Sequence, residues 1–237
     1  MTDLAGQIAL VTGASKGIGA ATAQALAAAG AHVVLTGRDT RGLEAAEQAI
    51  FEAGGSATIA PVDLADADGI ARLANAVAER WQRLDVLVHG AAVLPELMAV
   101  KDIDQTQLSK ALTTNVLASQ ALIARFDPLL RAAPDGRLIY LTSSLASAPR
   151  AYWGSYAATK AAAEALFDCY AQETRNISKL RVAIVDPGAT RTAMRAKAYP
   201  GEDPQSVKPP EMVAQRIVAL LGEQFASPHR ERVNQSS

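Results

Sequence analysis

Short apolar runs alternate with longer amphipathic segments along the chain, and this alternation restricts the fold more than any other feature of the sequence. The apolar runs occupy residues 8–12, 32–36, 57–62, 86–89, 137–142 and 181–185. Most of them are apolar at consecutive positions, as expected of parallel strands that are covered on both faces. The intervening segments predict helices at 18–29, 40–53, 66–81, 104–130 and 153–176, with a last helix at 210–221.

This repeated strand–helix order predicts an α/β fold: a three-layer, doubly wound (Rossmann-type) parallel sheet of six or seven strands. The 237 residues suit a single domain, and no linker rich in Gly, Ser or Pro divides them. Residues 189–209 are interrupted by prolines and show no period, so we expect a long loop that acts as a lid. The polar tail, residues 226–237, is expected to be frayed.

Charge and cysteine content exclude several classes of function. A net charge of −1 gives no electrostatic reason to expect nucleic acid or an anionic membrane surface as a partner. The single cysteine, Cys169, excludes an internal disulfide and indicates a reducing compartment, which we take to be the cytoplasm. We expect no signal peptide, no membrane-spanning segment and no metal site, because the sequence has none of their patterns.

A glycine-rich loop, Thr-Gly-Ala-Ser-Lys-Gly-Ile-Gly at residues 12–19, joins the first predicted strand to the first helix. Glycines in this place allow a pyrophosphate to approach the backbone at the helix N-terminus. We therefore expect a dinucleotide to contact Thr12, Gly13, Ser15, Lys16, Gly17, Ile18 and Gly19. The same residues fit the nucleophile elbow of α/β-hydrolases, but no earlier strand is present to supply an oxyanion loop.

The end of the second strand indicates which dinucleotide is bound. An NAD site usually has an acidic residue there, whereas this chain has Gly37 followed by Arg38. Arg38 and Lys16 suit the 2′-phosphate of NADP(H), although Asp39 lies near enough to compete. Asp63, after the third strand, could bind the adenine amino group or could cap the following helix.

Tyr156 and Lys160 are four residues apart on a predicted helix and therefore share one face. A nearby ammonium group favours the phenolate, so we expect Lys160 to lower the pKa of Tyr156 and make it a general acid/base. Taken alone, the spacing also fits a lysine that reaches solvent beside a core tyrosine.

Two further polar residues fall where such a site would need them. Ser143 ends the fifth strand, where ligands of these sheets bind, and could hold a substrate oxygen; its neighbour Ser144 is the alternative. Asn115 lies on the apolar stripe of its predicted helix and needs hydrogen-bond partners if it is buried. It could either cap a kink or hold a water that relays protons to Lys160.

Together these features resemble the short-chain dehydrogenase/reductase family, in order, from Ala5 to about Met194. The matching parts are residues 12–19, Asn115, 136–143, 156–160, 187–188 and Thr192. The resemblance implies a catalytic tetrad of Asn115, Ser143, Tyr156 and Lys160, with Tyr156 and Lys160 also contacting the cofactor. The remaining expected cofactor contacts are Leu64, Ala91, Pro187, Gly188, Thr190 and Thr192. Residues 186–195 are similar to a bacterial branch of the family with mostly unassigned substrates.

Two segments depart from the family pattern. The family's Asn-Asn-Ala-Gly segment is His89-Gly90-Ala91-Ala92 here, which puts the local cofactor geometry in question. The tail also lacks the family's usual Val-Asp-Gly-Gly ending, so a seventh strand is left open.

The substrate side of the site is expected to be mainly apolar. The expected lining is Val93, Leu94, Leu145, Tyr152, Trp153, Met194 and Tyr199, with Arg150, Arg191 and Arg195 near enough to bind a carboxylate. We predict an NADP(H)-dependent interconversion of a carbonyl and an alcohol on a small-molecule substrate. The alternative is a dinucleotide-binding sensor or scaffold without turnover. The family's habit of pairing its long helices implies a homodimer or homotetramer.

Overall fold

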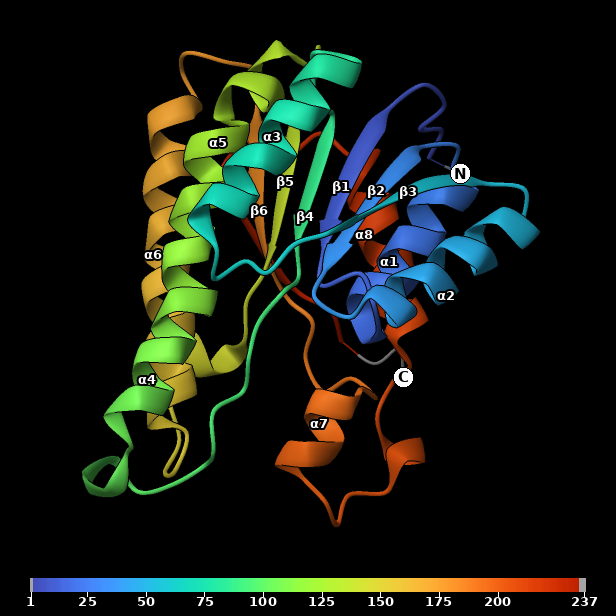
Figure 1. Cartoon of the computed structure of the whole chain (residues 1–237). Coiled ribbons are helices and arrows are strands. Elements are labelled where there is room, and N and C mark those ends of the chain that lie inside the picture. The colour runs from blue at the N-terminus through green and yellow to red at the C-terminus, as the bar shows by residue number, and fades with distance from the viewer. Residues whose placement is uncertain (1, 235–237) are drawn as a thin grey trace.

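A computed structural model describes residues 2–234 of the chain. Seven parallel strands form one sheet in the order β3-β2-β1-β4-β5-β6-β7, which confirms the predicted doubly wound fold (Figure 1). The strands are β1 (Ile8–Thr12), β2 (His32–Gly37), β3 (Ser56–Pro61), β4 (Val86–His89), β5 (Arg137–Leu141), β6 (Arg181–Asp186) and β7 (His229–Arg232).

The central strands are apolar at consecutive positions because both of their faces are covered. In β1, Ala9 and Val11 pack into the core on one side of the sheet, and Ile8 and Leu10 pack into the core on the other. All five β1 residues are buried. A strand enclosed in this way gains from apolar side chains on both faces, which explains the absence of an alternating pattern.

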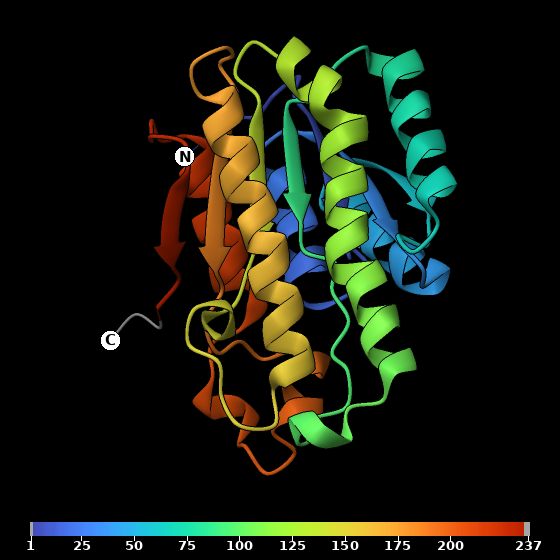
Figure 2. The ribbon, with the colours of Figure 1, turned by 90° about the vertical axis from the view of Figure 1, so that its left-hand side faces the viewer.

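Helices form a layer on each face of the sheet (Figures 1 and 2). The first layer contains α1 (Gly17–Ala28), α2 (Thr40–Glu52) and α8 (Pro210–Leu221). The second contains α3 (Ala67–Trp81), α5 (Ala118–Ala132) and α6 (Gly154–Thr174).

The helix predicted at 104–130 is not continuous, which corrects the prediction. It consists of α4 (Gln105–Leu112), a π-helical turn (Thr113–Leu117) and α5. The Ala118 amide donates to the carbonyl of Thr113, five residues back instead of four. Such π turns are frequent at functional sites, and this one contains Asn115.

The segment 189–209 lies beyond the carboxyl ends of the strands (Figure 1). It is not a structureless loop, because it contains α7 (Ala193–Ala198) and a 3-10 turn (Pro204–Ser206). The side chain of Thr192 caps α7 by accepting a hydrogen bond from the Arg195 amide at 3.1 Å. Local capping supplies the order that hydrophobic periodicity did not predict.

The tail contains the seventh strand, which corrects the expectation that residues 226–237 fray. Strand β7 pairs in parallel with β6, and Ala183 is opposite His229. The guanidinium of Arg230 pairs with carboxylates of Glu164 and Asp168 on α6. The sequence left this strand open because it is polar: ion pairs anchor it where apolar burial anchors the others. Residues 235–237 lie outside the described part.

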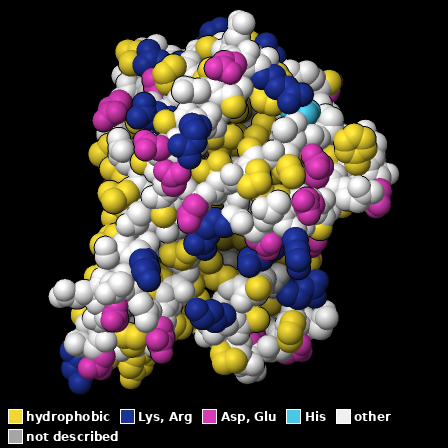
Figure 3. All heavy atoms as spheres, in the orientation of Figure 1, with side chains coloured by type: hydrophobic (Ala, Val, Ile, Leu, Met, Phe, Trp, Pro, Cys, Tyr) yellow, Lys and Arg dark blue, Asp and Glu magenta, His cyan; other side chains and the backbone are white. Residues whose placement is uncertain are grey.

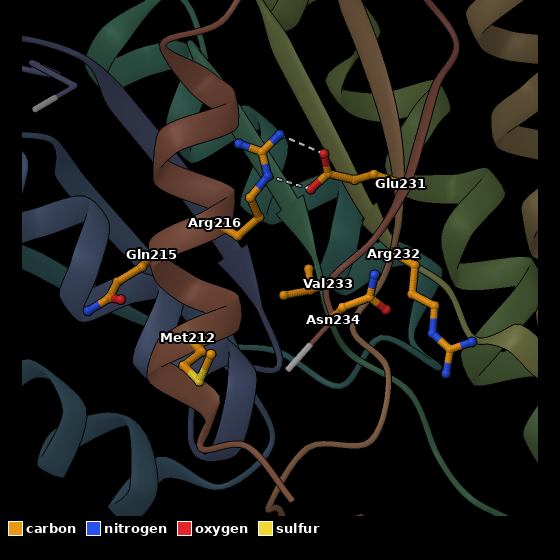
Figure 4. A pocket seen from close by; sticks show the side chains of 7 residues that line it. All are labelled: Met212, Gln215, Arg216, Glu231, Arg232, Val233 and Asn234. Carbon is orange, nitrogen blue, oxygen red and sulfur yellow. Dashed lines mark hydrogen bonds and ion pairs between the residues drawn. The ribbon is translucent and has the colours of Figure 1, made fainter. Parts of the chain in front are cut away.

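A hollow lies between α8 and β7, over an ion pair of Arg216 with Glu231 (Figure 4). Arg216 Nη2 lies 2.7 Å from Glu231 Oε2. The pair belongs to the packing of β7, since Arg216 also binds Glu223 at the end of α8. Within residues 2–234, no helix is long and apolar enough to cross a membrane, and no cluster of His, Cys, Asp and Glu could hold a metal ion.

Candidate active site

A pocket runs along the carboxyl ends of the strands, from the glycine loop to α6. This edge includes the place between β1 and β4 where the strand order reverses, the usual ligand site of such sheets. Figure 3 shows lysine and arginine side chains around the hollowed region above α7. The predicted residues that line the pocket are Gly13, Ser15, Lys16, Gly17, Ile18, Gly19, Arg38, Asp63, Leu64, Ala91, Val93, Tyr156, Lys160, Pro187, Thr192 and Met194.

Some predicted cofactor residues lie behind the pocket wall. Thr12 is fully buried. Its Oγ1 lies 2.8 Å from Nδ1 of His89 on β4. The hydroxyl of Thr190 donates to the carbonyls of Pro187 and Gly188 at 3.1 and 3.2 Å. These residues therefore shape the wall from behind.

The pocket also has lining residues that the sequence reasoning did not name: Val62, Thr114, Leu141, Thr142 and Ala193. Each directly adjoins a predicted element end or site residue. Their signal is position: Leu141 ends β5, and Val62 and Thr142 directly follow the ends of β3 and β5.

The glycine loop has the shape that a phosphate group requires. Gly13 has φ +72°, and a Cβ there would lie 2.9 Å from Cα of Ala91, so a side chain is excluded. Within the described chain, the N-cap residue of α1, Lys16, makes no side-chain hydrogen bond to the helix. The first amide groups of α1 therefore remain available to an anion at the positive end of the helix dipole. This arrangement fits a dinucleotide pyrophosphate.

The rim near the end of β2 carries the charges that distinguish one dinucleotide from another. Arg38 Nη1 lies 4.0 Å from Asp63 Oδ2, and both side chains are about half exposed. Asp39 caps α2, because its Oδ1 accepts a hydrogen bond from the Gly42 amide at 3.2 Å. This hydrogen bond engages one oxygen of the Asp39 carboxylate, and Asp39 also lines the pocket.

Asp63 does not cap the helix that follows it, so that alternative is wrong. The N-cap of α3 is Asp66, which accepts from the Asp68 amide at 3.0 Å. Asp63 Oδ1 instead accepts from the Ala65 amide at 3.0 Å.

Tyr156, in the first turn of α6, lies in a small apolar cluster beside the pocket. Only 9% of its surface is exposed, and it packs with Leu145 and Ala157. Leu94, Trp153 and Met194 cover the cluster. Burial raises the pKa of Tyr156 to about 12, and the charge of Asp186 acts in the same direction. The phenol is therefore protonated at neutral pH.

Lys160 is buried, and its ammonium group faces the strands. Nζ donates to the carbonyl of Leu141 at 2.5 Å and lies 4.4 Å from the ring centroid of Tyr140. Burial lowers the pKa of Lys160 to about 7, against the opposing carboxylates of Glu164 and Asp186. The expected lowering of the Tyr156 pKa by Lys160 is thus wrong for this arrangement, because desolvation of the phenol dominates.

The side chain of Asn115 is buried in the π turn and fully engaged. Its Oδ1 accepts from the Val93 amide at 2.8 Å. Its Nδ2 donates to the Val93 carbonyl and to Thr159 Oγ1, both at 3.0 Å. The amide group thus holds the segment after β4 against α6. Of the two expected roles, the structure supports the one in which Asn115 stabilises an irregular turn.

Ser143 and Ser144 follow β5 and begin a 3-10 turn. Ser143 Oγ accepts from the Leu145 amide at 3.3 Å, and the Ser144 carbonyl accepts from Ser147 Oγ at 3.3 Å. Neither serine lines the pocket, whereas the neighbouring Thr142 does. The hydroxyl of Thr142 is held by Glu164 Oε2 at 2.5 Å.

An aromatic contact joins the segment 189–209 to the active-site cluster. The rings of Trp153 and Tyr199 are 5.7 Å apart, and Trp153 lies 6.0 Å from Tyr156. Arg195 covers Tyr199, with Cζ 3.6 Å from its ring centroid, and makes two hydrogen bonds to Glu202. Arg195 is therefore committed within its own segment and does not face a substrate carboxylate.

The other predicted substrate-side residues lie further out. Arg191 donates to Gln205 Oε1 at 3.0 Å. Arg150 and Tyr152 are exposed, with Tyr152 63% accessible in a left-handed backbone conformation (φ +71°).

Comparison with known proteins gives matches over most of the chain. The family model described as short chain dehydrogenase matches residues 7–203. The uncharacterized oxidoreductase YciK of Escherichia coli (strain K12) is 35% identical and is aligned over 92% of this chain and 86% of its own.

Solved structures match the fold closely. A short chain dehydrogenase from Shigella flexneri complexed with NADP has a TM-score of 0.91 and 33% identity, covering 97% of this chain and 99% of its own. One from Escherichia coli CFT073 complexed with NADPH has a TM-score of 0.91 and 34% identity, covering 97% and 98%.

Proposed function

Because the chain belongs to the short-chain dehydrogenase family, we propose that it is an NADP(H)-dependent oxidoreductase that interconverts a carbonyl and an alcohol. The observation that carries this proposal is the placement of Tyr156 and Lys160 in the wall of the pocket that begins at the glycine loop. A proton-transferring pair there can act on a substrate oxygen next to the bound dinucleotide.

The choice of NADP(H) is supported by the charges at the rim. Arg38 and Lys16 supply two cations, and Asp39 is occupied in capping α2. A 2′-phosphate would therefore meet a guanidinium and an ammonium group, and the Gly42 amide offsets part of the Asp39 charge. The similar Shigella and Escherichia structures that contain NADP and NADPH agree with this choice.

In the proposed reduction, Tyr156 donates its phenolic proton to the substrate oxygen. Its raised pKa, about 12, keeps it protonated at neutral pH and so ready to donate. A nicotinamide bound along the glycine loop would supply the hydride. Lys160, one helical turn further along α6 and with a pKa of about 7, would then return a proton to the phenolate that remains, with Nζ leaving the Leu141 carbonyl.

Further residues complete the proposed machinery. Ser143, at the end of β5, would hold the substrate oxygen beside Tyr156. Asn115 fixes Val93 and Thr159 on either side of the site. Pro187, Thr192 and the residues of the glycine loop would border the cofactor.

The substrate side would accept a small, mainly apolar molecule. Leu94, Trp153 and Met194 cover Tyr156 with indole, thioether and aliphatic groups. The segment 189–209 would act as the lid, because its Tyr199 rests on Trp153. Entry of a substrate would then require Tyr199 and Trp153 to separate.

We further propose that the protein forms a homodimer or homotetramer through its long helices. Leu117, in the π turn before α5, is 62% exposed, and Cys169 on α6 is exposed. Burying such side chains between subunits would remove apolar surface from water. A monomer by light scattering at micromolar concentration would contradict this proposal.

The decisive experiment for the activity measures NADPH oxidation at 340 nm with aldehydes, ketones and quinones. We expect turnover by the wild type and a loss of at least about a hundredfold in Tyr156→Phe, with NADPH binding retained. Tyr170→Phe is the matched control, because this α6 tyrosine donates to Asp127, away from the pocket, and should leave turnover unchanged.

The rival function is a dinucleotide-binding sensor or scaffold, which the altered segment His89–Ala92 favours. NADPH binding by the wild type without turnover across the whole panel would support that function and overturn the enzymatic one.

A further inference from the structure

A continuous line of hydrogen bonds runs beneath the pocket from the glycine loop to the π turn. It begins at the Ala91 amide, which donates to Thr12 Oγ1 at 3.1 Å. Thr12 Oγ1 lies 2.8 Å from His89 Nδ1, and His89 Nε2 lies 3.0 Å from Ser119 Oγ. Ser119 Oγ donates to the carbonyl of Asn115 at 2.9 Å. His89 is the middle member of this line.

The line fixes the protonation of His89. The hydroxyl hydrogen of Ser119 is directed at the Asn115 carbonyl, so Ser119 can only accept from His89 Nε2. Nε2 therefore carries the proton, and Nδ1 accepts from the hydroxyl of Thr12. Burial and the charge of Lys160 lower the pKa of His89 to about 3, so the ring stays neutral.

Packing holds the imidazole in this orientation. His89 is 1% exposed and is the register partner of Thr12 on β1 and of Tyr140 on β5. Its ring stacks on that of Tyr140 at 5.7 Å and lies 5.9 Å from the ring of Phe167. A ring confined by three neighbouring elements cannot turn without breaking both of its hydrogen bonds.

We propose that His89 is a positioning residue that fixes the Asn115 turn relative to the glycine loop. The inference rests on the proposed function, since it concerns how the cofactor side of that site and the side that carries Tyr156 are held at fixed positions relative to each other. Thr12 and Ala91 belong to the cofactor side, and Asn115 leads through Thr159 to the backbone of Tyr156. The imidazole joins the two sides through neutral hydrogen bonds, which transmit position without exchanging charge.

The first test reads the tautomer directly and needs no turnover. Nitrogen NMR of the full-length protein, free and with NADPH, should show His89 neutral and protonated at Nε2 from pH 5 to 8. In Ser119→Ala the Nε2 proton loses its acceptor, so the His89 nitrogen shifts should move. A charged ring, an Nδ1-protonated ring or unchanged shifts in Ser119→Ala would overturn the inference.

The second test compares two variants that each remove one buried hydroxyl. Ser119→Ala removes the link to Asn115, whereas Thr174→Val removes a buried hydroxyl that donates to the Tyr170 carbonyl, also four residues back, at 2.8 Å. We expect kcat to fall about tenfold in Ser119→Ala, with KM for NADPH within twofold of wild type, and to stay unchanged in Thr174→Val. An unchanged kcat in Ser119→Ala, or an equal fall in both variants, would overturn the inference.

The two tests separate this inference from the proposed function. A wild-type protein without turnover on any carbonyl would contradict the proposed function alone. The nitrogen shifts of the wild type and of Ser119→Ala would then decide whether the hydrogen-bonded line exists as inferred.

Discussion

Thr159 Oγ1 accepts a hydrogen bond from Asn115 Nδ2 at 3.0 Å. The same hydroxyl donates to the carbonyl of Tyr156 at 2.9 Å. The π turn and the first turns of α6 are therefore joined by one side chain that is fully buried. A connection of this kind holds Tyr156 in place without touching a substrate.

Thr159→Val, which keeps the shape and removes the hydroxyl, tests that connection. The buried Asn115 amide loses a partner, so we expect unfolding to become easier by about 1–2 kcal/mol. Since Tyr156 loses a support, kcat should fall about tenfold. Thr22→Val is the control, because the Thr22 hydroxyl is buried without a partner among residues 2–234 and should be dispensable. Equal effects of both variants on kcat would contradict the assigned role.

Arg38→Ala tests the cofactor preference. Loss of one charge-assisted contact to a 2′-phosphate should raise KM for NADPH by about ten- to a hundredfold, while KM for NADH changes little. Arg38→Asp should move the preference towards NADH. Arg72→Ala, which removes an exposed arginine paired with Asp66, is the control. Better kcat/KM with NADH than with NADPH in the wild type would refute the preference itself.

Burial of Lys160 predicts a particular dependence of stability on pH. The folded pKa, about 7, lies below the ordinary lysine pKa of 10.5, so the unfolded chain binds this proton more tightly. The destabilisation is complete below about pH 7 and is relieved as the pH rises towards 10.5. Relative to Lys160→Met, the wild type should therefore gain up to about 1.4 kcal/mol per pH unit in this window.

Urea unfolding at pH 7, 8 and 9 measures that difference. Subtracting the Lys160→Met curve is necessary because burial also lowers the pKa of Lys208, which adds a slope of the same sign. Burial lowers the pKa of His89 to about 3, so His89 contributes only on the acid side. The exposed Lys179→Met serves as the control, and parallel wild-type and Lys160→Met curves would show that Lys160 does not titrate in this range.

The sequence predicted most of the sheet because apolar runs and glycine turns act locally. Six strands and the last helix, Pro210–Leu221, appear within about a residue or two of their predicted ends. The π turn escaped prediction because its cause is tertiary: Asn115 binds Val93 and Thr159, which are distant in sequence. The seventh strand was left open because Arg230 is anchored by Glu164 and Asp168, and hydrophobic periodicity contains no information about ion pairs.

The site residues were easier to locate than their chemistry. Tyr156 and Lys160 share the pocket, as their spacing predicted. The direction of the Tyr156 pKa shift was wrong, because spacing does not reveal that Lys160 turns towards Leu141 or that Trp153 covers the phenol. Burial, which decides both pKa values, depends on packing that a local pattern does not contain.

Tyr140 offers a test of the cation–π contact below the site. Lys160 Nζ lies 4.4 Å from the centroid of the Tyr140 ring. The Tyr140 hydroxyl is buried without a hydrogen-bond partner among residues 2–234. Tyr140→Phe should keep the ring contact and remove the unpaired hydroxyl, so we expect stability to be unchanged or higher by about 1 kcal/mol. Tyr140→Leu should lose the contact and lower both stability and kcat. A fall in kcat of equal size in both variants would show that the hydroxyl matters instead.

The proposed lid makes a prediction that does not depend on turnover. Arg195 on α7 is held by Glu202 and lies over Tyr199, so this ion pair ties the short helix to the turn that follows it. Glu202→Gln removes the charge that holds the guanidinium. The segment should then open more often, and trypsin should cleave after Arg195 or Lys197 faster than in the wild type.

Glu223→Gln is the matched control, because it weakens a comparable arginine pair, Arg216 with Glu223, at the end of α8. It should leave cleavage after Arg195 and Lys197 at the wild-type rate. Peptide mapping of timed digests locates the cuts, and NADPH should slow them if the segment closes over the cofactor. Cleavage at equal rates in wild type and Glu202→Gln would mean that the Arg195–Glu202 pair does not hold the segment, and that other contacts keep it closed.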